Sequence, residues 1–187
     1  LKSVVGGHGV DLGGRRFINE PIGGKRPASM VKRGIALVPE GRRLFPSLSV
    51  EENLLIGGQL KRSGPWSLAR IYELFPMLAE RRSHPSTSLS GGQQQMVAIG
   101  RALMSNPRLL LCDEISLGLA PIVVKDIYSR MATITGEGTA VVIVEQDISQ
   151  ALSSSSRCYC LQEGRISLEG ASSSLSRQAV KDAYFGV

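Results

Sequence analysis

Three short stretches carry side chains of the kinds that hold phosphate groups, metal ions and water. Residues 89–95 read LSGGQQQ, residues 108–114 read RLLLCDE and residues 142–147 read VIVEQD. A serine and two glycines directly before a helical pattern leave backbone N–H groups at the positive end of the helix dipole, where an anion can approach closely. The same Ser-Gly-Gly is also a good helix cap, so this stretch alone leaves a phosphate site and a plain cap both open.

The second stretch ends in two adjacent carboxylates, Asp113 and Glu114, after an apolar run that is typical of a buried strand. Ligands of open α/β sheets gather at the carboxyl ends of the strands. One carboxylate there can hold Mg²⁺ while its neighbour accepts a proton from an attacking water. The alternative is a pair of solvated acids at a strand end. Gln146, at the end of the third stretch, offers an amide that can donate to a phosphate oxygen, which is weak evidence by itself.

The elements that must position these side chains are three nearly continuous apolar runs with helical patterns between them. The runs are GIALVPE (34–40), RLLLCDE (108–114) and TAVVIVEQD (139–147), and they are typical of parallel strands covered on both faces. Helical periodicity covers residues 91–104 and residues 121–135, with Gly136 expected to stop the second helix. Strand, helix and strand in this order predict a right-handed crossover and an α/β sheet. The expected buried stripes of the two helices are Met96, Ile99, Gly100 and Leu103, and Val123, Ile127, Met131 and Ile134.

Two further segments complete the expected organisation. Residues 45–88 carry helical patterns with no strand between them, which indicates a helical insertion. Residues 158–170 predict a hairpin with its turn near Glu163 and Gly164, and residues 175–185 predict a closing helix.

Composition places the chain among globular proteins of one domain. It has 187 residues, of which 42% are hydrophobic, enough to bury a core. The net charge of +6 comes from Lys and Arg spread in pairs, which favours a solvated surface or an acidic partner over a nucleic-acid surface. The longest apolar runs fall far short of the roughly 20 residues that cross a bilayer.

The cysteines and serines indicate no chemistry of their own. Cys112, Cys158 and Cys160 form no disulfide framework, and a reducing, cytoplasmic setting fits them best. The pair Cys158 and Cys160 is expected to pack on one face of a strand and not to bind metal. The serine clusters at 153–156 and 172–174 are expected at the surface.

The order and spacing of these stretches resemble the ATP-binding subunits of ABC transporters, most closely those of branched-chain amino-acid importers. The resemblance covers essentially the whole chain, through VPEGRRLFPSLSVEENL (38–54), YELFPMLAERR (72–82), the segment from LSGGQQQ to LGLAP (89–121), VVIVEQD (141–147) and KDAYFGV (181–187). It implies an α/β, P-loop NTPase-like (RecA-like) parallel sheet core with a helical subdomain insertion, incomplete at the N-terminus. The implied parts are residues 1–44 as the rest of an N-terminal core that ends in the Q-loop, 45–104 as the helical subdomain with the signature motif, and 105–187 as the C-terminal part of the core with Walker B, D-loop and switch region.

The resemblance also implies a role for each matching residue. The signature motif, which contacts the γ-phosphate of ATP held by the opposite subunit of a head-to-tail dimer, matches Leu89, Ser90, Gly91, Gly92 and Gln93. Asp113 matches the Walker B aspartate that supports Mg²⁺, with Glu40 as a possible second ligand, and Glu114 matches the catalytic glutamate that polarises water. The Q-loop matches Glu40, the switch position Gln146, and the D-loop Gly118, Leu119 and Ala120.

Four positions depart from the wider family. Glu40 stands where glutamine is usual, Gln146 where a switch histidine is usual, Ala120 where many relatives have aspartate, and Ile115 where proline is common. The residues at the first two positions resemble those of the ATPases in the branched-chain amino-acid branch of the family. A glutamine at position 146 weakens any mechanism that requires a protonatable histidine.

The implied activity is ATP hydrolysis with Mg²⁺ that drives import of branched-chain or similar hydrophobic amino acids through a transmembrane permease. Implied partners are a second ABC ATPase subunit, identical or different, the permease subunits and, indirectly, a substrate-binding protein. The implied location is the cytoplasmic side, peripheral on the inner face of the membrane. Urea or amide importers have similar ATPases and stay an alternative. An ABC-type ATPase acting on nucleic acid or ribosomes would predict a second cassette or a coiled-coil insertion, and neither is in the sequence, so no nucleic-acid partner is expected.

A nucleotide-cradling loop is not found in the 187 residues. A Walker A loop requires G-x-x-x-x-G-K followed by Ser or Thr, whereas the one Gly-Lys pair, Gly24 and Lys25, is followed by Arg26 and has Asn19 in the place of the first glycine. The opening LKSVVGG resembles the end of a P-loop helix, so we expect the loop to be encoded upstream of Leu1. A chain without it is expected to have negligible ATPase activity by itself, as a non-catalytic interaction piece would. His8 and His84 are expected in loops.

Overall fold

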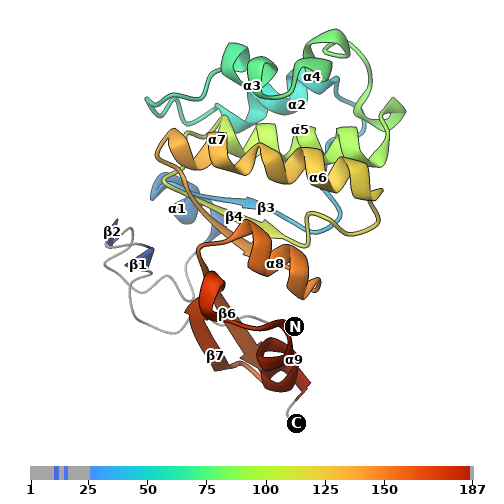
Figure 1. Ribbon diagram of the computed structural model, residues 1–187. Helices are drawn as coiled ribbons and strands as arrows, with labels where there is room; N and C mark the ends of the chain where they lie inside the picture. The colour runs from blue at the N-terminus through green and yellow to red at the C-terminus, as the bar shows by residue number, and fades with distance from the viewer. Residues whose placement is uncertain (1–10, 13–14, 17–25, 186–187) are drawn as a thin grey trace.

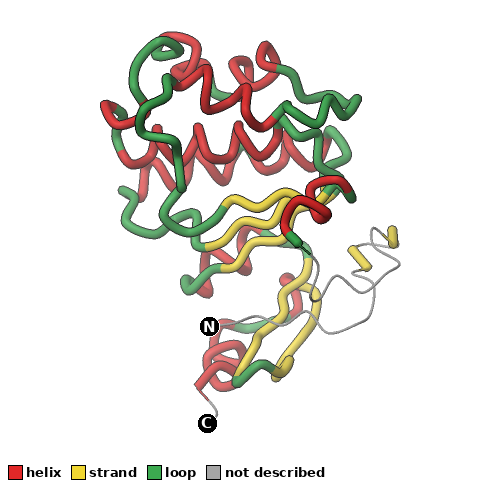
Figure 2. Tube along the Cα trace, turned by 180° about the vertical axis from the view of Figure 1, so that it is seen from behind, coloured by secondary structure: helices red, strands yellow, loops and turns green. Residues whose placement is uncertain are grey.

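The computed structural model describes residues 11–12, 15–16 and 26–185, and the predictions for His8, Asn19, Gly24 and Lys25 lie outside the described residues. Its central sheet has the order β3-β4-β5 and all three strands are parallel. The strands are β3 (Ile35–Val38), β4 (Leu109–Asp113) and β5 (Ala140–Val144), with Val38 opposite Cys112 and Cys112 opposite Ile143. The predicted α/β parallel sheet is therefore confirmed, with its strands within the predicted apolar runs. Figure 2 shows the three strands side by side beneath a layer of helices.

One face of the sheet packs against α5 (Gly91–Leu103), which lies between the sheet and the helices of residues 50–80 (Figure 1). Successive side chains of a strand point to opposite faces, and Val38 and Cys112 are on the face that joins the hydrophobic core. On the other face Leu37 stays 57% exposed and Val144 47% exposed. This face is therefore covered only in part in the described ranges: Ile35 and Leu109 on it are buried at 5% and 2% exposure, and α1 (Pro27–Lys32) contacts β3.

The predicted helix over residues 121–135 forms as two pieces, α6 (Pro121–Ser129) and α7 (Met131–Gly136). The break is at Arg130, whose N–H bonds the carbonyl of Ile127 at 3.1 Å in a tighter, 3₁₀-type turn. Gly136 is the last helical residue and not the stop; the left-handed residue that ends the helix is Gly138, with φ of 87°. Of the predicted stripe, Val123 is half-buried, and Ile127, Met131 and Ile134 are buried as expected.

Residues 45–88 form the predicted helical insertion, with no strand among its described residues and a single isolated bridge between Ser49 and Pro85. Its helices are α2 (Val50–Gly57), α3 (Leu68–Leu74), α4 (Pro76–Glu80) and the 3₁₀ turn η1 (Ser86–Ser88), and Figure 1 shows them above α5. Their apolar side chains share one core with α5, in which Leu54, Ile71 and Ile99 are fully buried. Burial of each such side chain contributes about 1.5–3 kcal/mol, so the insertion and the sheet are stabilised through the same helix.

A buried asparagine fixes the start of this insertion. Asn53 is 0% exposed. Its Oδ1 accepts a hydrogen bond from the N–H of Phe45 at 2.9 Å, and its Nδ2 donates to the carbonyl of Ser49 at 2.9 Å. Ser49 caps α2 in a capping box with Glu52. The segment between β3 and α2 is thus held by polar bonds inside the core.

Trp66 joins the insertion to the loops that enter the sheet. Its buried Nε1 donates to Thr139 Oγ1 at 3.2 Å, just before β5. Its backbone N–H donates to Asn106 Oδ1 at 2.7 Å, just before β4. The helical layer is therefore attached to the sheet at the amino ends of the strands, on the opposite side from the candidate site.

The C-terminal part follows the prediction with two differences. The hairpin of β6 (Arg157–Gln162) and β7 (Arg165–Ala171) turns at Glu163 and Gly164, whose φ values of 49° and 79° fit the predicted tight turn. The closing helix is α9 (Arg177–Phe185), and Cys158 and Cys160 share a face of β6, where Cys160 is buried.

The differences are one helix and one serine. The helix α8 (Ile148–Ser154) is not predicted from its polar sequence and is capped by Asp147. Ser172, at the start of the short turn η2 (Ser172–Ser174), is buried, with its Oγ 2.8 Å from Ser155 Oγ, so the expectation of a surface cluster is wrong there.

The described residues also include a small antiparallel pair, β1 (Asp11–Leu12) with β2 (Arg15–Arg16). Within the described ranges no helix has the length and apolar character needed to cross a bilayer.

Candidate functional site

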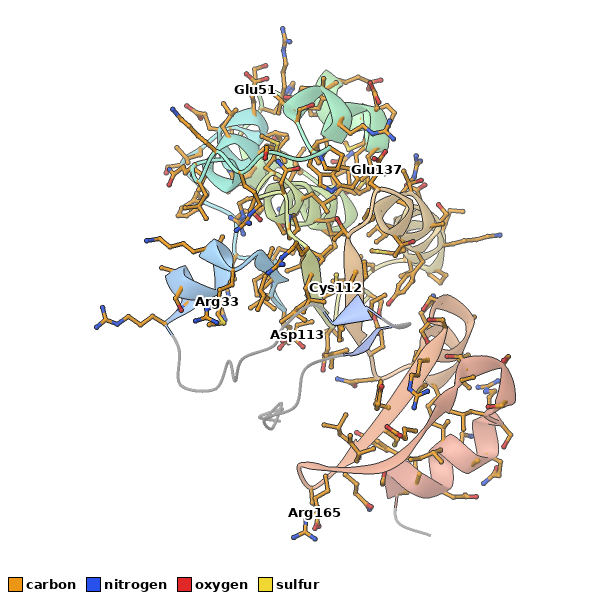
Figure 3. All side chains as sticks on the ribbon, turned by 90° about the vertical axis from the view of Figure 1, so that its left-hand side faces the viewer. Arg33, Glu51, Cys112, Asp113, Glu137 and Arg165 are labelled. Atoms are coloured by element: carbon orange, nitrogen blue, oxygen red, sulfur yellow. The ribbon has the colours of Figure 1, made fainter. Side chains whose placement is uncertain are left out.

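The carboxyl ends of the three parallel strands bring the predicted site residues to one edge of the sheet. Glu40 follows β3, Asp113 ends β4, and Gln146 follows β5. Cys112 points into the core at 1% exposure, and the pleat therefore turns Asp113 to the other face, where it is half-buried. In Figure 3 Asp113 lies on the side of β4 away from the helical layer that carries Glu51.

Glu114 and Gln146 are in direct contact at this edge. The Nε2 of Gln146 donates a hydrogen bond to Oε1 of Glu114 at 2.7 Å. Since the amide occupies one carboxylate oxygen, the other can accept a hydrogen bond from a water. An amide does not exchange a proton as an imidazole does, so Gln146 can orient the carboxylate but cannot relay its proton. The two residues predicted as catalytic are thus placed together.

The backbone of Glu114 takes a left-handed conformation, with φ of 47°. For a residue with a Cβ this conformation costs about 1–2 kcal/mol. It is held by the hydrogen bond from the N–H of Glu114 to the carbonyl of Val144 at 3.0 Å, one more bond between the ends of β4 and β5. The turn carries the Glu114 side chain off the strand and toward Gln146.

The donor set at this edge fits Mg²⁺ as a partner of phosphate. Among the described residues no group of three or more His, Cys, Asp and Glu side chains could hold a metal ion by itself. Mg²⁺ is usually bound through one or two carboxylates, with waters and substrate phosphates completing its shell. The side chain of Asp113 can supply one such carboxylate. Glu40 is exposed in the turn after β3, and the described part of the chain gives its carboxylate no hydrogen bond or ion pair.

The predicted phosphate-holding stretch is the capped start of α5. Ser90 Oγ accepts from the N–H of Gln93 at 3.4 Å, and Gln93 Oε1 accepts from the N–H of Ser90 at 3.0 Å. The helix-cap interpretation is therefore confirmed, and it uses the side chains of both residues. Leu89 is buried at 7% exposure and anchors the stretch in the core. The first N–H groups of a helix have no intrahelical acceptor, so the cap still leaves the N–H groups of Gly91 and Gly92 to an outside anion.

A cation that the sequence reasoning missed lies at the same helix end. Gly41, Arg42 and Arg43 all have positive φ (73°, 65° and 48°), and this turn brings the guanidinium of Arg42 onto Gly91, where an added Cβ would lie 3.1 Å from Arg42 Nη2. Arg101 of α5 holds the turn by donating from Nη2 to the carbonyl of Arg42 at 3.0 Å. A positive charge at a helix N-terminus suits an anion there. The pair of arginines after Glu40 was the signal in the sequence.

The predicted D-loop residues form the turn between β4 and α6. Gly118 has φ of 69°, Leu119 packs against the core, and Ala120 is the N-cap of α6 without a side-chain cap bond. Two large apolar side chains flank the turn and are exposed, Leu117 at 53% and Ile122 at 74%. The turn thus presents an apolar surface next to the start of α5.

Glu145, between the end of β5 and Gln146, is a second residue that sequence reasoning missed. Its Oε2 accepts a hydrogen bond from Ser116 Oγ at 2.8 Å, and its Oε1 accepts from the hydroxyl of Tyr128. Burial, followed by the bond to Glu145, raises the pKa of Tyr128 above its ordinary value, so the hydroxyl stays a donor. Burial also raises the pKa of Cys112 to about 12, which leaves this thiol protonated and unreactive. A carboxylate directly after a strand and beside Gln146 was the only sequence signal for Glu145.

The two glycines of the capped stretch are expected to respond differently to alanine. A Cβ on Gly92 would lie 2.3 Å from Cγ1 of Val123 on α6, whereas a Cβ on Gly91 would meet only the mobile end of Arg42. Gly92→Ala must push α6 away from α5 and should lower the free energy of unfolding by about 1–2 kcal/mol. Gly91→Ala is the matched control and should stay within about 0.5 kcal/mol of the unchanged protein. Urea unfolding of the two variants measures the difference, and equal midpoints would contradict the close approach of the two helices.

Comparison with known proteins agrees with this geometry. The branched-chain amino acid transport ATP-binding protein BraG of Pseudomonas aeruginosa is 42% identical over all of this chain and 81% of its own length. The probable branched-chain amino acid transport ATP-binding protein LivF of Archaeoglobus fulgidus is 31% identical over 94% of this chain and 75% of its own length. Among solved structures, a bacterial ABC transporter cassette in dimeric form has a TM-score of 0.68 and 28% identity, covering 82% of this chain and 70% of the cassette.

A family model described as ABC transporter matches residues 9–116, more than half of the chain, and its end includes Asp113, Glu114 and Ser116. With the parallel sheet, the capped helix and the paired Glu114 and Gln146 already in place, the chain belongs to the ABC transporter family of ATP-binding proteins.

Proposed function

We propose that this protein is the ATP-hydrolysing subunit of an ABC importer for branched-chain or similar hydrophobic amino acids. The observation that carries the hydrolytic part is the 2.7 Å hydrogen bond between Gln146 and Glu114 at the strand edge that also carries Asp113. The substrate class is supported by the 42% identity to a protein named for branched-chain amino acid transport. Urea or amide import is the alternative that the same ATPase architecture would serve.

In the proposed reaction each residue has a limited task. Glu114 accepts a hydrogen bond, and then a proton, from the attacking water through the oxygen that Gln146 leaves free. Gln146 orients that carboxylate. Asp113 holds Mg²⁺, with Glu40 as a second possible ligand, and the bound ion supplies neutralisation of the phosphate charge. Phosphoryl transfer depends mainly on positioning and charge neutralisation, which are the two things this edge offers.

The start of α5 serves the ATP held by a partner subunit in this proposal. Ser90, Gly91 and Gly92 present backbone N–H groups and the positive helix end to the γ-phosphate, with Leu89 and Gln93 fixing the stretch. The exposed Leu117 and Ile122 beside Gly118, Leu119 and Ala120 would be covered by the second subunit, identical or different. The dimeric cassette among the structural relatives supports such an assembly.

The remaining assignments follow the same proposal. Residues 45–104 form the helical part that meets the transmembrane permease, residues 1–44 belong to the core up to the Q-loop, and residues 105–187 complete the core. The subunit works on the cytoplasmic face of the membrane, with a substrate-binding protein as an indirect partner on the other side.

Two assays test the proposal. The protein encoded by the complete reading frame, reconstituted with its permease in vesicles, should take up labelled leucine only with Mg-ATP, and urea should not compete. The 187-residue chain contains no Walker A pattern and should hydrolyse Mg-ATP only at background rate. Turnover by the 187-residue chain would refute that prediction. Tight, salt-sensitive binding of DNA or RNA by the complete protein would favour the nucleic-acid alternative instead.

A further inference from the structure

Glu145 connects three elements around the candidate site through its side chain and its neighbours. Its carboxylate is half-buried and is held by hydroxyl groups from the turn after β4, through Ser116 at 2.8 Å, and from the last turn of α6, through Tyr128. Tyr128 is itself buried at 9% exposure, so its hydroxyl has a fixed position in the core. Bonds to an ionised acceptor are roughly twice as strong as neutral ones, which makes these two bonds a firm attachment.

Three successive residues at the end of β5 are attached in turn. The carbonyl of Val144 accepts from the N–H of Glu114 at 3.0 Å, the carboxylate of Glu145 binds Ser116 and Tyr128, and the amide of Gln146 donates to Glu114 at 2.7 Å. In an extended chain neighbouring side chains point to opposite sides. Glu145 is therefore held from the core side while Gln146 is presented to the outside.

The hydrogen bonds of Glu145 fix the backbone from which the Gln146 side chain extends. Gln146 is exposed and lies two residues beyond the end of β5, so its own surroundings do little to select one side-chain conformation. The backbone at position 145 is the nearest point that the core can fix. Without the two hydroxyl bonds, the half-buried carboxylate of Glu145 would have to leave the core to regain hydration, and it would carry position 146 with it.

The same bond extends the link to α6. This helix begins at Pro121, directly after Gly118, Leu119 and Ala120, the turn that we assign to the contact with the second subunit. Tyr128 lies two turns along α6, and its hydroxyl ends on Glu145. A displacement of α6 would therefore reach the Gln146 and Glu114 pair through one side chain.

We propose that Glu145 is a positioning residue for hydrolysis: held by Ser116 and Tyr128, it fixes Gln146 against Glu114 and makes that pair responsive to the position of α6. The inference rests on the proposed ATPase function of the same edge. It adds a residue that acts on hydrolysis through Gln146.

The test compares Glu145→Ala, Glu145→Gln and Tyr128→Phe with the control Ser129→Ala, all in the protein encoded by the complete reading frame. Ser129 is exposed at the end of α6, and its hydroxyl donates to the carbonyl of Asp126 at 2.7 Å. Glu145→Ala should lower kcat about 10-fold with KM for ATP within about twofold. Glu145→Gln keeps one acceptor oxygen and should recover part of that loss, and Ser129→Ala should leave kcat unchanged.

A double-mutant cycle separates positioning from a general structural effect. If Glu145 acts through Gln146, then Glu145→Ala should cause no further loss of kcat when Gln146→Ala is already present. Additive losses in the two single variants and the double variant would overturn the proposal. Tyr128→Phe keeps the ring in the core and should lower kcat about threefold. If Glu145→Ala does not fold, this variant tests the proposal, and an unchanged kcat would overturn it.

A second measurement does not depend on hydrolysis. The side-chain amide resonances of Gln146 should shift in Glu145→Ala and in Tyr128→Phe, and not in Ser129→Ala, with no nucleotide present. An unchanged Gln146 amide in both variants would overturn the proposal whatever the activities. If the unchanged protein shows no ATPase activity while the resonances shift as expected, the proposed function fails and the positioning role stands.

Discussion

Replacing Glu114 with glutamine is expected to lower kcat for ATP hydrolysis at least about 100-fold, the usual contribution of a general base. Glutamine keeps the shape of the side chain, and its carbonyl oxygen can still accept the bond from Gln146 that now measures 2.7 Å. It cannot accept the proton of the attacking water. Nucleotide binding should therefore persist while hydrolysis stops, and the ATP-bound dimer should last longer than in the unchanged protein.

Steady-state turnover and size-exclusion chromatography with Mg-ATP measure the two effects on the product of the complete reading frame. Glu163→Gln is the matched control, because Glu163 is exposed in the hairpin turn. This substitution removes the same charge far from the sheet edge. Its turnover should equal that of the unchanged protein. A Glu114→Gln variant that keeps full turnover would show that another group accepts the proton.

The strands, the main helices and the site edge could be predicted because their signals are local. Apolar runs such as residues 109–113 and 140–144 are short and end on charged residues, so both the strand and its functional end can be read along the chain. The capping-box spacing of Ser90 and Gln93 predicts the start of α5 by itself. Once three strands are parallel, their carboxyl ends must share an edge, which brings Glu114 and Gln146 together.

The contacts that the sequence could not supply join residues far apart in the chain or depend on unusual backbone angles. Arg42 reaches Gly91 because two arginines adopt positive φ, which residue type does not predict. The bond from Tyr128 to Glu145 requires the exact rotation of α6 over the sheet. The helix α8 escapes prediction because its polar sequence depends on one cap, the two bonds that Asp147 accepts from Ser149 and Gln150.

The closest helix crossing in the described chain makes Gly57→Ala the substitution with the largest expected loss of stability. Gly57 ends α2 where it lies on α5, and an added Cβ would lie 1.9 Å from the carbonyl oxygen of Arg101 and 2.8 Å from its carbonyl carbon. Backbone cannot rotate away as a side-chain tip can, so the two helices must separate along the core that contains Leu54 and Ile99. We expect the free energy of unfolding to fall by about 3 kcal/mol, at the upper end of overpacking costs.

Gly58→Ala is the matched control one residue along. There the nearest atom to an added Cβ is the flexible Cε of Met104 at 3.3 Å, and the φ of −84° suits alanine. Urea unfolding should therefore show a midpoint close to that of the unchanged protein for Gly58→Ala and a much lower midpoint for Gly57→Ala. Equal midpoints would contradict the close crossing. Because the side chain of Arg101 also holds the carbonyl of Arg42 at 3.0 Å, a displaced α5 should in addition release the turn beside Gly91, so Gly57→Ala should weaken ATP-dependent dimerisation even at temperatures where it stays folded.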